Sequence, residues 1–472
     1  MVDTTRSAAP TTGTSLKGSV GVAGIVFLVI AAAAPLTAVA GSLPVMVAIG
    51  NGAGAPLAYV VAAAVLLVFS VGYAAMSSEV TDTGAFYAYV TQGLGRSPGL
   101  GAAALALLAY TTIQAAIYGL AASTLRDVVL RFGGPDLPWW LWAVVLLGVV
   151  ALLGYRSIDL GARVLGFLLV AEIALIVLLS VAVLARGGAH GVDAASFTPS
   201  AFLSGSPGIA LMFAIGSFVG FEATAIYGEE ARDPRRTVPV ATYVAVATIG
   251  VLYAVASWAV VLAFGSAEVQ AAAQVDPAGL TFVAASTFLG GTAADVMMVM
   301  LVTSLFAALL AFHNAIARYA FALARAGYAP RRLMEVHPRH GSPHAGSLVQ
   351  TASAVVLVGV FALAGADPVL ELFTWMAGVS IVAILAVMVL TSVAIIAYFR
   401  SVGSGRTLWH TTVAPVLGTL GLVGITVLVI ANFTTLIGGS RVLAIAFLAL
   451  VAATFLGGTA VGRWRRPARR SA

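Results

Sequence analysis

The stretch FAIGSFVGFEATAIYGEEARDPRRTVP, residues 213–239, decides the fold of this chain. An apolar run is interrupted by Gly216 and Gly220, carries a carboxylate at Glu222, and then enters a dense charged loop. Glycine weakens a helix, and a carboxylate inside hydrocarbon is costly enough to mark a functional position. These features predict a broken, charged helix inside a membrane rather than a plain hydrophobic anchor.

The composition of the whole chain points to a lipid environment. Of its 472 residues, 61% are hydrophobic and only 9% are charged, whereas soluble domains carry about 25% charged residues. The apolar runs reach about 20 residues and show no strict alternation, so they predict helices rather than barrel strands. We therefore expect an all-α membrane protein.

The residue types that are missing exclude several kinds of chemistry. The chain has no cysteine, so it has no disulfide, thiolate metal site or cysteine nucleophile. Its single lysine, Lys17, lies in the polar N-terminal tail, which excludes a Walker A phosphate loop and ATP-driven pumping by this chain alone. His337, His340 and His344 lie in a proline-interrupted loop without a carboxylate ligand set, so we expect no metal and no cofactor.

About twelve apolar runs are candidate membrane spans. They lie near residues 20–49, 56–78, 100–125, 139–155, 164–185, 209–228, 240–264, 296–323, 347–364, 370–398, 411–432 and 442–462. The expected organisation is an N-terminal tail (1–19), a transport core of ten helices (20–400), two further helices (401–462) and a basic tail (463–472).

The basic residues are distributed unequally between the two sides of the membrane. An even number of spans places both termini on one side, and that side holds 20 of the 24 positive residues. The other side holds Arg126, Arg131, Arg186 and Arg441. Because positive loops stay in the cytoplasm, both termini are expected there, in a multi-pass protein of the cell membrane. This topology also accounts for the net charge of +6 without a nucleic-acid partner.

The first span is interrupted at a place that corresponds to the break in the sixth. It reads FLVIAAAAPLTAVAGSLP (27–44), with Pro35, Gly41 and Pro44 inside the apolar run. Proline removes a backbone donor and clashes with the preceding turn. Two broken helices five spans apart predict an inverted-repeat secondary transporter with its substrate at both breaks. Glycine and proline are also common in ordinary membrane helices, but the matched placement and the nearby Glu222 favour the functional interpretation.

Three segments resemble amino acid–polyamine–organocation (APC) superfamily permeases of the bacterial amino acid permease type. They are GFEATAIYGEEARDPRRTVPVA (220–241), similar to the sixth-helix signature, TGAFYAYVTQGLGRSPG (83–99), similar to the loop between helices two and three, and HNAIARYAFALARAGYAPRRLMEVHPRHGSPHAGSLVQ (313–350), similar to helix eight and the loop after it. The resemblance implies a LeuT-type 5+5 inverted repeat with discontinuous helices one and six. It also implies secondary active transport of amino acids or related amines, often by proton symport and sometimes by exchange.

The chain departs from this family in two places. Family amino acid carriers commonly have a Gly-Ser-Gly break in helix one that receives the substrate carboxylate on backbone N–H groups, whereas Pro35, Leu36 and Thr37 stand here. Because proline has no N–H, a polyamine or organocation carrier stays an alternative. Several members also carry a helix-five lysine that mimics sodium. Glu172 stands at that position, so this coupling mechanism is not implied.

The expected substrate site combines the two breaks with one face of the third helix. It consists of Ala34, Pro35, Leu36, Thr37, Gly41, Gly216, Phe218, Gly220, Glu222, Tyr110 and Gln114. Tyr110, Gln114 and Tyr118 share one helix face, and they either line the pathway or hold helices together. Phe218 either closes over the substrate or packs in the core.

Glu172 and Glu222 are the candidate proton carriers. Glu172 lies roughly 16 Å along the fifth span, near mid-bilayer, where it either exchanges a proton or holds helices together by one hydrogen bond. Glu222 follows the break directly, and it either reaches a substrate ammonium or proton or satisfies loose N–H groups of the unwound turn. Thr303 and Ser304 offer hydroxyls either to a sodium ion, the minority interpretation, or to helix packing.

The charged end of the sixth span is the candidate inner gate. Glu229, Glu230, Arg235 and Arg236 mix both signs within a few residues. They are expected to form ion pairs that break and remake as the gate moves, and a plain solvated loop is the alternative. No catalytic constellation and no repeated filter motif is present, so the sequence favours a transporter over an enzyme or a channel.

Overall fold

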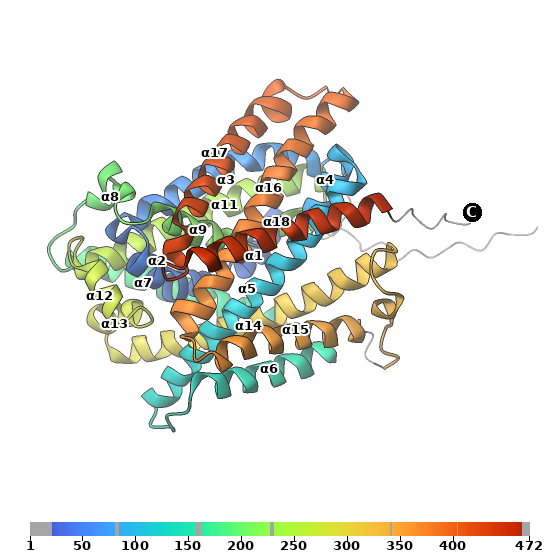
Figure 1. The fold of residues 1–472 in the computed structure, drawn as a ribbon. Helices are drawn as coiled ribbons and strands as arrows, with labels where there is room; N and C mark the ends of the chain where they lie inside the picture. The colour runs from blue at the N-terminus through green and yellow to red at the C-terminus, as the bar shows by residue number, and fades with distance from the viewer. Residues whose placement is uncertain are drawn as a thin grey trace, which may run out of the picture.

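The computed structural model describes residues 21–80, 85–156, 162–226, 231–339, 342–403 and 405–464. Among these residues, ten helices are long and apolar enough to cross a membrane. The two other predicted spans are the 17-residue helix α6 (Trp139–Tyr155) and the broken pair α9 (Pro207–Phe218) and α10 (Ala223–Ile226). The prediction of an all-α membrane protein with about twelve spans is confirmed (Figure 1).

The remaining long helices follow the chain order of the predicted spans. They are α1 (Val22–Ala32) with its continuation η1 (Thr37–Ser42) and α2 (Leu43–Ile49), α3 (Ala55–Ser77), α5 (Arg96–Arg131), α7 (Ala162–Arg186), α11 (Pro234–Phe264), α14 (Gly291–Arg325), α15 (His344–Leu363), η6 (Pro368–Phe373) with α16 (Thr374–Val402), η7 (Trp409–Val413) with α17 (Ala414–Leu436), and α18 (Arg441–Trp464).

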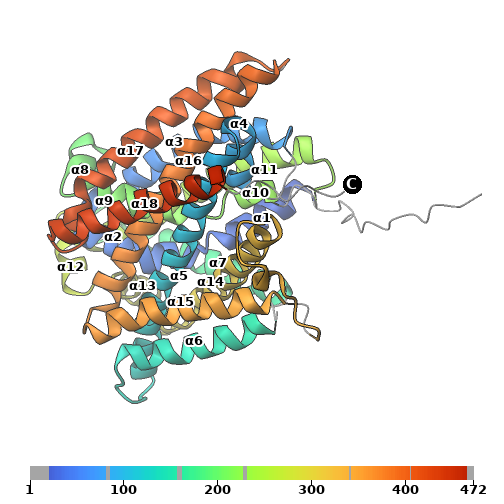
Figure 2. The same cartoon turned by 45° about the vertical axis from the view of Figure 1, so that its right-hand side comes forward.

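Several short helices connect the spans, and the search for long apolar runs missed them. They are η2 (Gly52–Gly54), α4 (Ala85–Leu94), η3 (Ala195–Phe197), α8 (Pro199–Leu203), α12 (Val269–Val275), α13 (Leu280–Leu289) and η5 (Arg331–Met334). We call the side where α1 begins and α18 ends the terminal face. Helices α8 and α12 lie on the opposite side of the molecule from the C-terminus in both views (Figures 1 and 2).

The long helices form an inner and an outer group. In α16, 72% of the most apolar stretch is buried, and α5 and α11 are also mostly buried, whereas in α18 the share is 11%. Helix α18 packs along α5 and exposes its apolar side chains to the outside (Figure 1). An apolar outer surface is suited to lipid tails, so the inner helices are the ones that can surround a substrate.

The break in the first span lies just before Pro35. Helix α1 ends at Ala32, and Ala34 has a φ of +45°, the one positive φ at a non-glycine position among the described residues. A left-handed residue with a Cβ is strained, by roughly 1–2 kcal/mol. Pro35 then begins the second half of the helix, a position at which its fixed φ fits and its missing N–H is not needed.

The break in the sixth span lies further along the chain than Gly216. Helix α9 continues through Gly216 to Phe218, so the expectation that Gly216 interrupts the helix was wrong. Gly220 has a φ of +114°, which a residue with a side chain adopts only under strain. A Cβ at Gly220 would lie 3.1 Å from the Cβ of Ala32, which shows that the two breaks meet in space.

Candidate functional site

A small cavity of about 80 Å³ lies between the two broken helices. The remaining walls come from α5, α14, η6 and α16, and most of the lining is apolar. The lining residues are Ala32, Ala33, Ala34, Thr37, Ala38, Ser42, Ile113, Ile117, Met212, Phe213, Gly216, Ser217, Val219, Ala308, Phe312, Phe373, Ala377 and Ile381. The only polar side chains in this set are the hydroxyls of Thr37, Ser42 and Ser217.

The predicted substrate residues divide into a lining group and a surrounding group. Ala34, Thr37 and Gly216 line the cavity directly. The other predicted residues are outside this lining, among the residues that the structure describes; they are Pro35, Leu36, Gly41, Phe218, Gly220, Glu222, Tyr110 and Gln114. Gly41 packs against Leu120 of α5. The lining therefore comes from more helices than the sequence predicted. The predicted site consisted of the two breaks and one face of α5.

Glu222 binds the unwound backbone at the break in the sixth span. Its side chain is only 5% exposed, and its Oε2 atom accepts a hydrogen bond of 2.8 Å from the N–H of Gly220. The backbone N–H of Glu222 lies near the same carboxylate. The hydroxyl of Tyr110 reaches Oε1 at 3.5 Å. Glu222 therefore satisfies amides of the unwound turn, as one of its two interpretations expected.

Glu172 plays a matching part at the break in the first span, although it belongs to α7. Its side chain is 4% exposed, and its carboxylate lies near the backbone N–H of Leu36. The hydroxyl of Ser304 on α14 donates to Oε2 at 3.2 Å, and Thr37 lies 3.4 Å from Ser304. A carboxylate from one helix thus joins the start of the half-helix to α14.

Two tyrosines on neighbouring helices donate hydrogen bonds to backbone carbonyls at the breaks. They were not predicted from the sequence. Tyr253 on α11 donates to the carbonyl of Ala33 at 3.2 Å, and Tyr73 on α3 donates to the carbonyl of Glu222 at 2.9 Å. In a 5+5 repeat α3 and α11 are counterparts, and each serves the break of the opposite repeat. A tyrosine inside an otherwise apolar span was the available signal, because a buried hydroxyl needs a partner.

The predicted polar stripe on α5 does not act as a unit. Tyr110 contacts Glu222 and packs its ring 5.9 Å from that of Phe312, which lines the cavity. Gln114 donates to the carbonyl of Leu309 at 2.9 Å and accepts a hydrogen bond from Gln350 on α15. Tyr110 therefore belongs to the surroundings of the cavity, whereas Gln114 joins α5, α14 and α15.

Phe218 and the polar residues of α14 have packing partners. Phe218 is fully buried and meets the ring of Tyr253 edge-on, with centroids 6.0 Å apart. The hydroxyl of Thr303 donates to the carbonyl of Met300 at 2.8 Å. His313 is buried and lies 2.8 Å from the hydroxyl of Ser347 on α15. These contacts fix the helices around the cavity.

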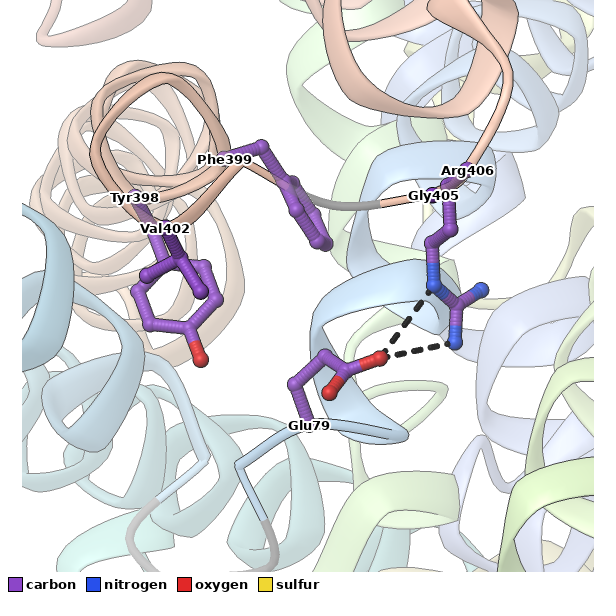
Figure 3. Close-up of a pocket in the computed structure, with 6 residues that line it drawn as sticks. All are labelled: Glu79, Tyr398, Phe399, Val402, Gly405 and Arg406. Atoms are coloured by element: carbon purple, nitrogen blue, oxygen red, sulfur yellow. Dashed lines mark hydrogen bonds and ion pairs between the residues drawn. The ribbon is translucent and has the colours of Figure 1, made fainter.

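The predicted inner gate is described only in part. Glu229 and Glu230 lie outside the described residues, and Arg235 and Arg236 are exposed in the first turn of α11. An ion pair that the sequence did not single out lies on the terminal face (Figure 3). There Arg406 donates to Glu79 at 3.2 Å beside a cavity of about 340 Å³, which Tyr398, Phe399, Val402 and Gly405 also line.

The fold and the paired breaks define a membrane transporter of the inverted-repeat class. The crystal structure of a manganese transporter from Eremococcus coleocola, in complex with an aromatic bis-isothiourea compound, superposes with a TM-score of 0.56. The superposition covers 97% of this chain and 96% of that chain at 17% sequence identity. At this identity the likeness shows the fold alone.

The sequence comparisons give the family. The profile of the amino acid permease family matches residues 20–460, so the chain belongs to this family. It is 30% identical over 155 residues to an uncharacterized transporter of Mycobacterium tuberculosis, covering 32% of this chain and 33% of that protein. It is 23% identical over 316 residues to the low-affinity putrescine importer PlaP of Escherichia coli, covering 65% of this chain and 66% of that protein. The matches thus span a third to two thirds of these relatives.

Proposed function

We propose that this chain is a secondary active transporter that moves amino acids or related amines across the cell membrane by alternating access. The observation that carries the proposal is the meeting of two helix breaks at one small cavity. Gly220 approaches Ala32 closely, and residues of both broken helices line the cavity. Broken helices that meet at a cavity inside a bundle are the usual substrate site of inverted-repeat transporters.

Symport with protons is the coupling that the site supports best. Glu172 and Glu222 are both buried, and no ion pair joins either of them to a base within the described part of the chain. A lone carboxylate is costly at membrane depth unless it binds a proton or a cation. A proton taken up from one side and released to the other would let these side chains couple transport to the proton gradient.

The orientation follows from the distribution of positive charge. We place the terminal face in the cytoplasm, with the tails 1–19 and 463–472, because most of the arginines belong to that side. On this side Glu229, Glu230, Arg235 and Arg236 would form the inner gate. Residues 20–400 would carry transport, and residues 401–462 would brace this core.

A polyamine or organocation carrier is the second candidate, and an exchanger is the third. The putrescine importer among the relatives supports the second candidate, as does Pro35 at the position where amino acid carriers present an amide. An exchanger would share the same cavity and the same breaks. It would differ in requiring substrate on both sides of the membrane.

The test is uptake by the purified chain in liposomes of phosphatidylethanolamine and phosphatidylglycerol. Radiolabelled amino acids and amines are supplied outside at acidic pH, with protein-free liposomes as the control. We expect saturable accumulation of at least one of these solutes in unmodified form. If none is carried while an unrelated solute is, the substrate class is wrong. Flux that does not saturate would indicate a channel, and a chemically altered solute would indicate an enzyme.

A further inference from the structure

The backbone amides at the first break are almost all taken by the protein itself. A half-helix start can receive a carboxylate because its first N–H groups have no partner within the helix. Here Pro35 has no N–H, and the carboxylate of Glu172 lies near the N–H of Leu36. The N–H of Ala38 donates to the carbonyl of Ala34 at 3.2 Å. Three of the four positions from 35 to 38 are therefore closed to a substrate anion.

The second break is closed in the same way. The N–H of Gly220 donates to the carboxylate of Glu222 at 2.8 Å. The N–H of Phe221 donates to the carbonyl of Phe218 at 3.1 Å, and that of Ala223 donates to the carbonyl of Gly220 at 3.1 Å. Three of the four amides from Gly220 to Ala223 are thus bonded within the protein. Both breaks have a glutamate where a carboxylate ligand would otherwise lie.

The cavity offers nothing that would replace these amides. Its described lining contains no arginine, lysine or histidine, and its three hydroxyls are the only polar side chains. A carboxylate in the cavity would lose its water without gaining a strong donor, and two glutamates would lie nearby. An ammonium group meets the opposite situation, because the groups around the breaks are carboxylates and carbonyls. The apolar walls suit an alkyl or aryl chain.

We propose that Glu172 and Glu222 act as built-in substitutes for a substrate carboxylate, so that this chain selects amines without a carboxylate over the amino acids from which they derive. The proposal rests on the proposed transport function and narrows its substrate class. Glu172 and Pro35 are the positions that set this selectivity at the first break. Glu222 sets it at the second.

Matched pairs of solutes that differ only in the carboxylate test the proposal. The pairs are ornithine and putrescine, lysine and cadaverine, arginine and agmatine, and phenylalanine and phenethylamine. Each is offered as a competitor of uptake into the liposomes described above. We expect the amine of at least one pair to bind at least about tenfold more tightly than its amino acid, which is the effect of one charged hydrogen bond. Equal or tighter binding of the amino acid in every pair that binds would overturn the proposal.

Variants at the first break test the named residues. Glu172→Ala frees the N–H of Leu36, and we expect it to lower the preference for the amine about tenfold. Glu172→Gln keeps an oxygen acceptor at the same place and is the matched control, with a smaller change. Pro35→Ala adds an N–H and should act in the same direction as Glu172→Ala. If Glu172→Ala does not fold, Pro35→Ala gives the decision. An unchanged preference in a folded variant would overturn the role of these residues.

The two proposals fail in different ways. If neither member of any pair is bound or carried while an unrelated solute is, the transport function proposed above is wrong. If amino acids are carried and their amines are not, transport stands and the carboxylate substitution is wrong.

Discussion

The two helix breaks are built from the same three kinds of residue, but these residues belong to different elements of the fold. Each break has one residue with positive φ, one tyrosine bonded to a carbonyl and one glutamate whose carboxylate lies near a backbone amide. In the sixth span the positive φ belongs to Gly220, and Glu222 lies two residues further on. In the first span the positive φ belongs to Ala34, and the glutamate comes from α7.

The difference indicates how each break is stabilised. The break in the sixth span is determined by its local sequence, because glycine adopts a positive φ without strain. The break in the first span depends on tertiary contacts, because Ala34 is strained and the carboxylate near Leu36 comes from another helix. A movement of α7 would therefore loosen the first break and leave the second intact. Such an asymmetry would allow one repeat to move against the other.

A substitution at Gly220, the residue with positive φ in the sixth span, should have the largest effect on stability. Gly220→Ala should destabilise the protein by about 3 kcal/mol, because φ is +114° and a Cβ would press on Ala32. Gly359→Ala is the matched control, since a Cβ there meets nothing within 4 Å. Thermal unfolding in detergent and uptake in liposomes are the measurements. Equal stability of the two variants would contradict the local account of the sixth span.

A substitution at Ala34, the residue with positive φ in the first span, should have the opposite effect on stability. Ala34→Gly removes the strain at φ +45° and should leave stability unchanged or raise it by up to about 1 kcal/mol. The same unfolding assay measures it. A loss of more than about 1 kcal/mol would show that Ala34 is not strained and that its methyl group matters for packing.

Removing each glutamate should separate the local cap from the tertiary one. Glu222→Ala leaves the N–H of Gly220 without its partner, and Glu172→Ala leaves the hydroxyl of Ser304 without its acceptor; the loss of a buried partner costs about 1–3 kcal/mol. Hydrogen exchange should show faster exchange at Gly220 in the first variant and at Leu36 in the second. We expect only Glu172→Ala to loosen α7 and α14 as well, because Glu172 also accepts from Ser304. Identical exchange patterns would contradict the comparison.

The two tyrosines should give matched and smaller effects. Tyr253→Phe and Tyr73→Phe each remove one hydrogen bond to a carbonyl at a break and should cost about 1 kcal/mol each. Tyr118→Phe is the control, since Tyr118 is buried in α5 and the break carbonyls are bonded by Tyr253 and Tyr73. We expect a clear loss of uptake in the first two variants and little loss in the control. A larger loss of uptake in the control than in the two variants would show that Tyr253 and Tyr73 do not support the site.

The ion pair on the terminal face should give the smallest effect. Arg406 and Glu79 are 34% and 40% exposed, so Arg406→Ala should cost no more than about 1 kcal/mol, and less at high salt. Unfolding at two salt concentrations measures this. A loss as large as that of Glu172→Ala would mean that the pair controls the inner side of the transporter.

The sequence was sufficient for the spans and for the pairing of the breaks, but not for their geometry. Long apolar runs define spans whatever their neighbours are, whereas short helices such as α4 and α13 lack that signal. Pro35 indicated the first break, yet the strained residue is Ala34, because a proline at the start of a helix displaces the irregular backbone to the residue before it. Gly216 was predicted to be part of the second break, but it is helical.

The contacts between distant segments could not be predicted. Glu172 could be placed near mid-bilayer by its depth along the span, but nothing local indicated that it would reach Leu36 and Ser304. The same holds for Tyr73 and Tyr253, whose partners lie in the opposite repeat. Such contacts depend on how the two repeats pack, and a single sequence contains no direct record of that packing.

Substrate-driven proton entry into liposomes tests the central claim most directly. A pH-sensitive dye is enclosed with the reconstituted protein, and the transported amine or amino acid is added outside. We predict that the interior acidifies with the wild-type chain, and that Glu222→Gln, which keeps the shape of the side chain but cannot release a proton, abolishes the signal. Uptake without proton movement in the wild type, or an unchanged signal in Glu222→Gln, would contradict the account of a proton-coupled site at paired helix breaks.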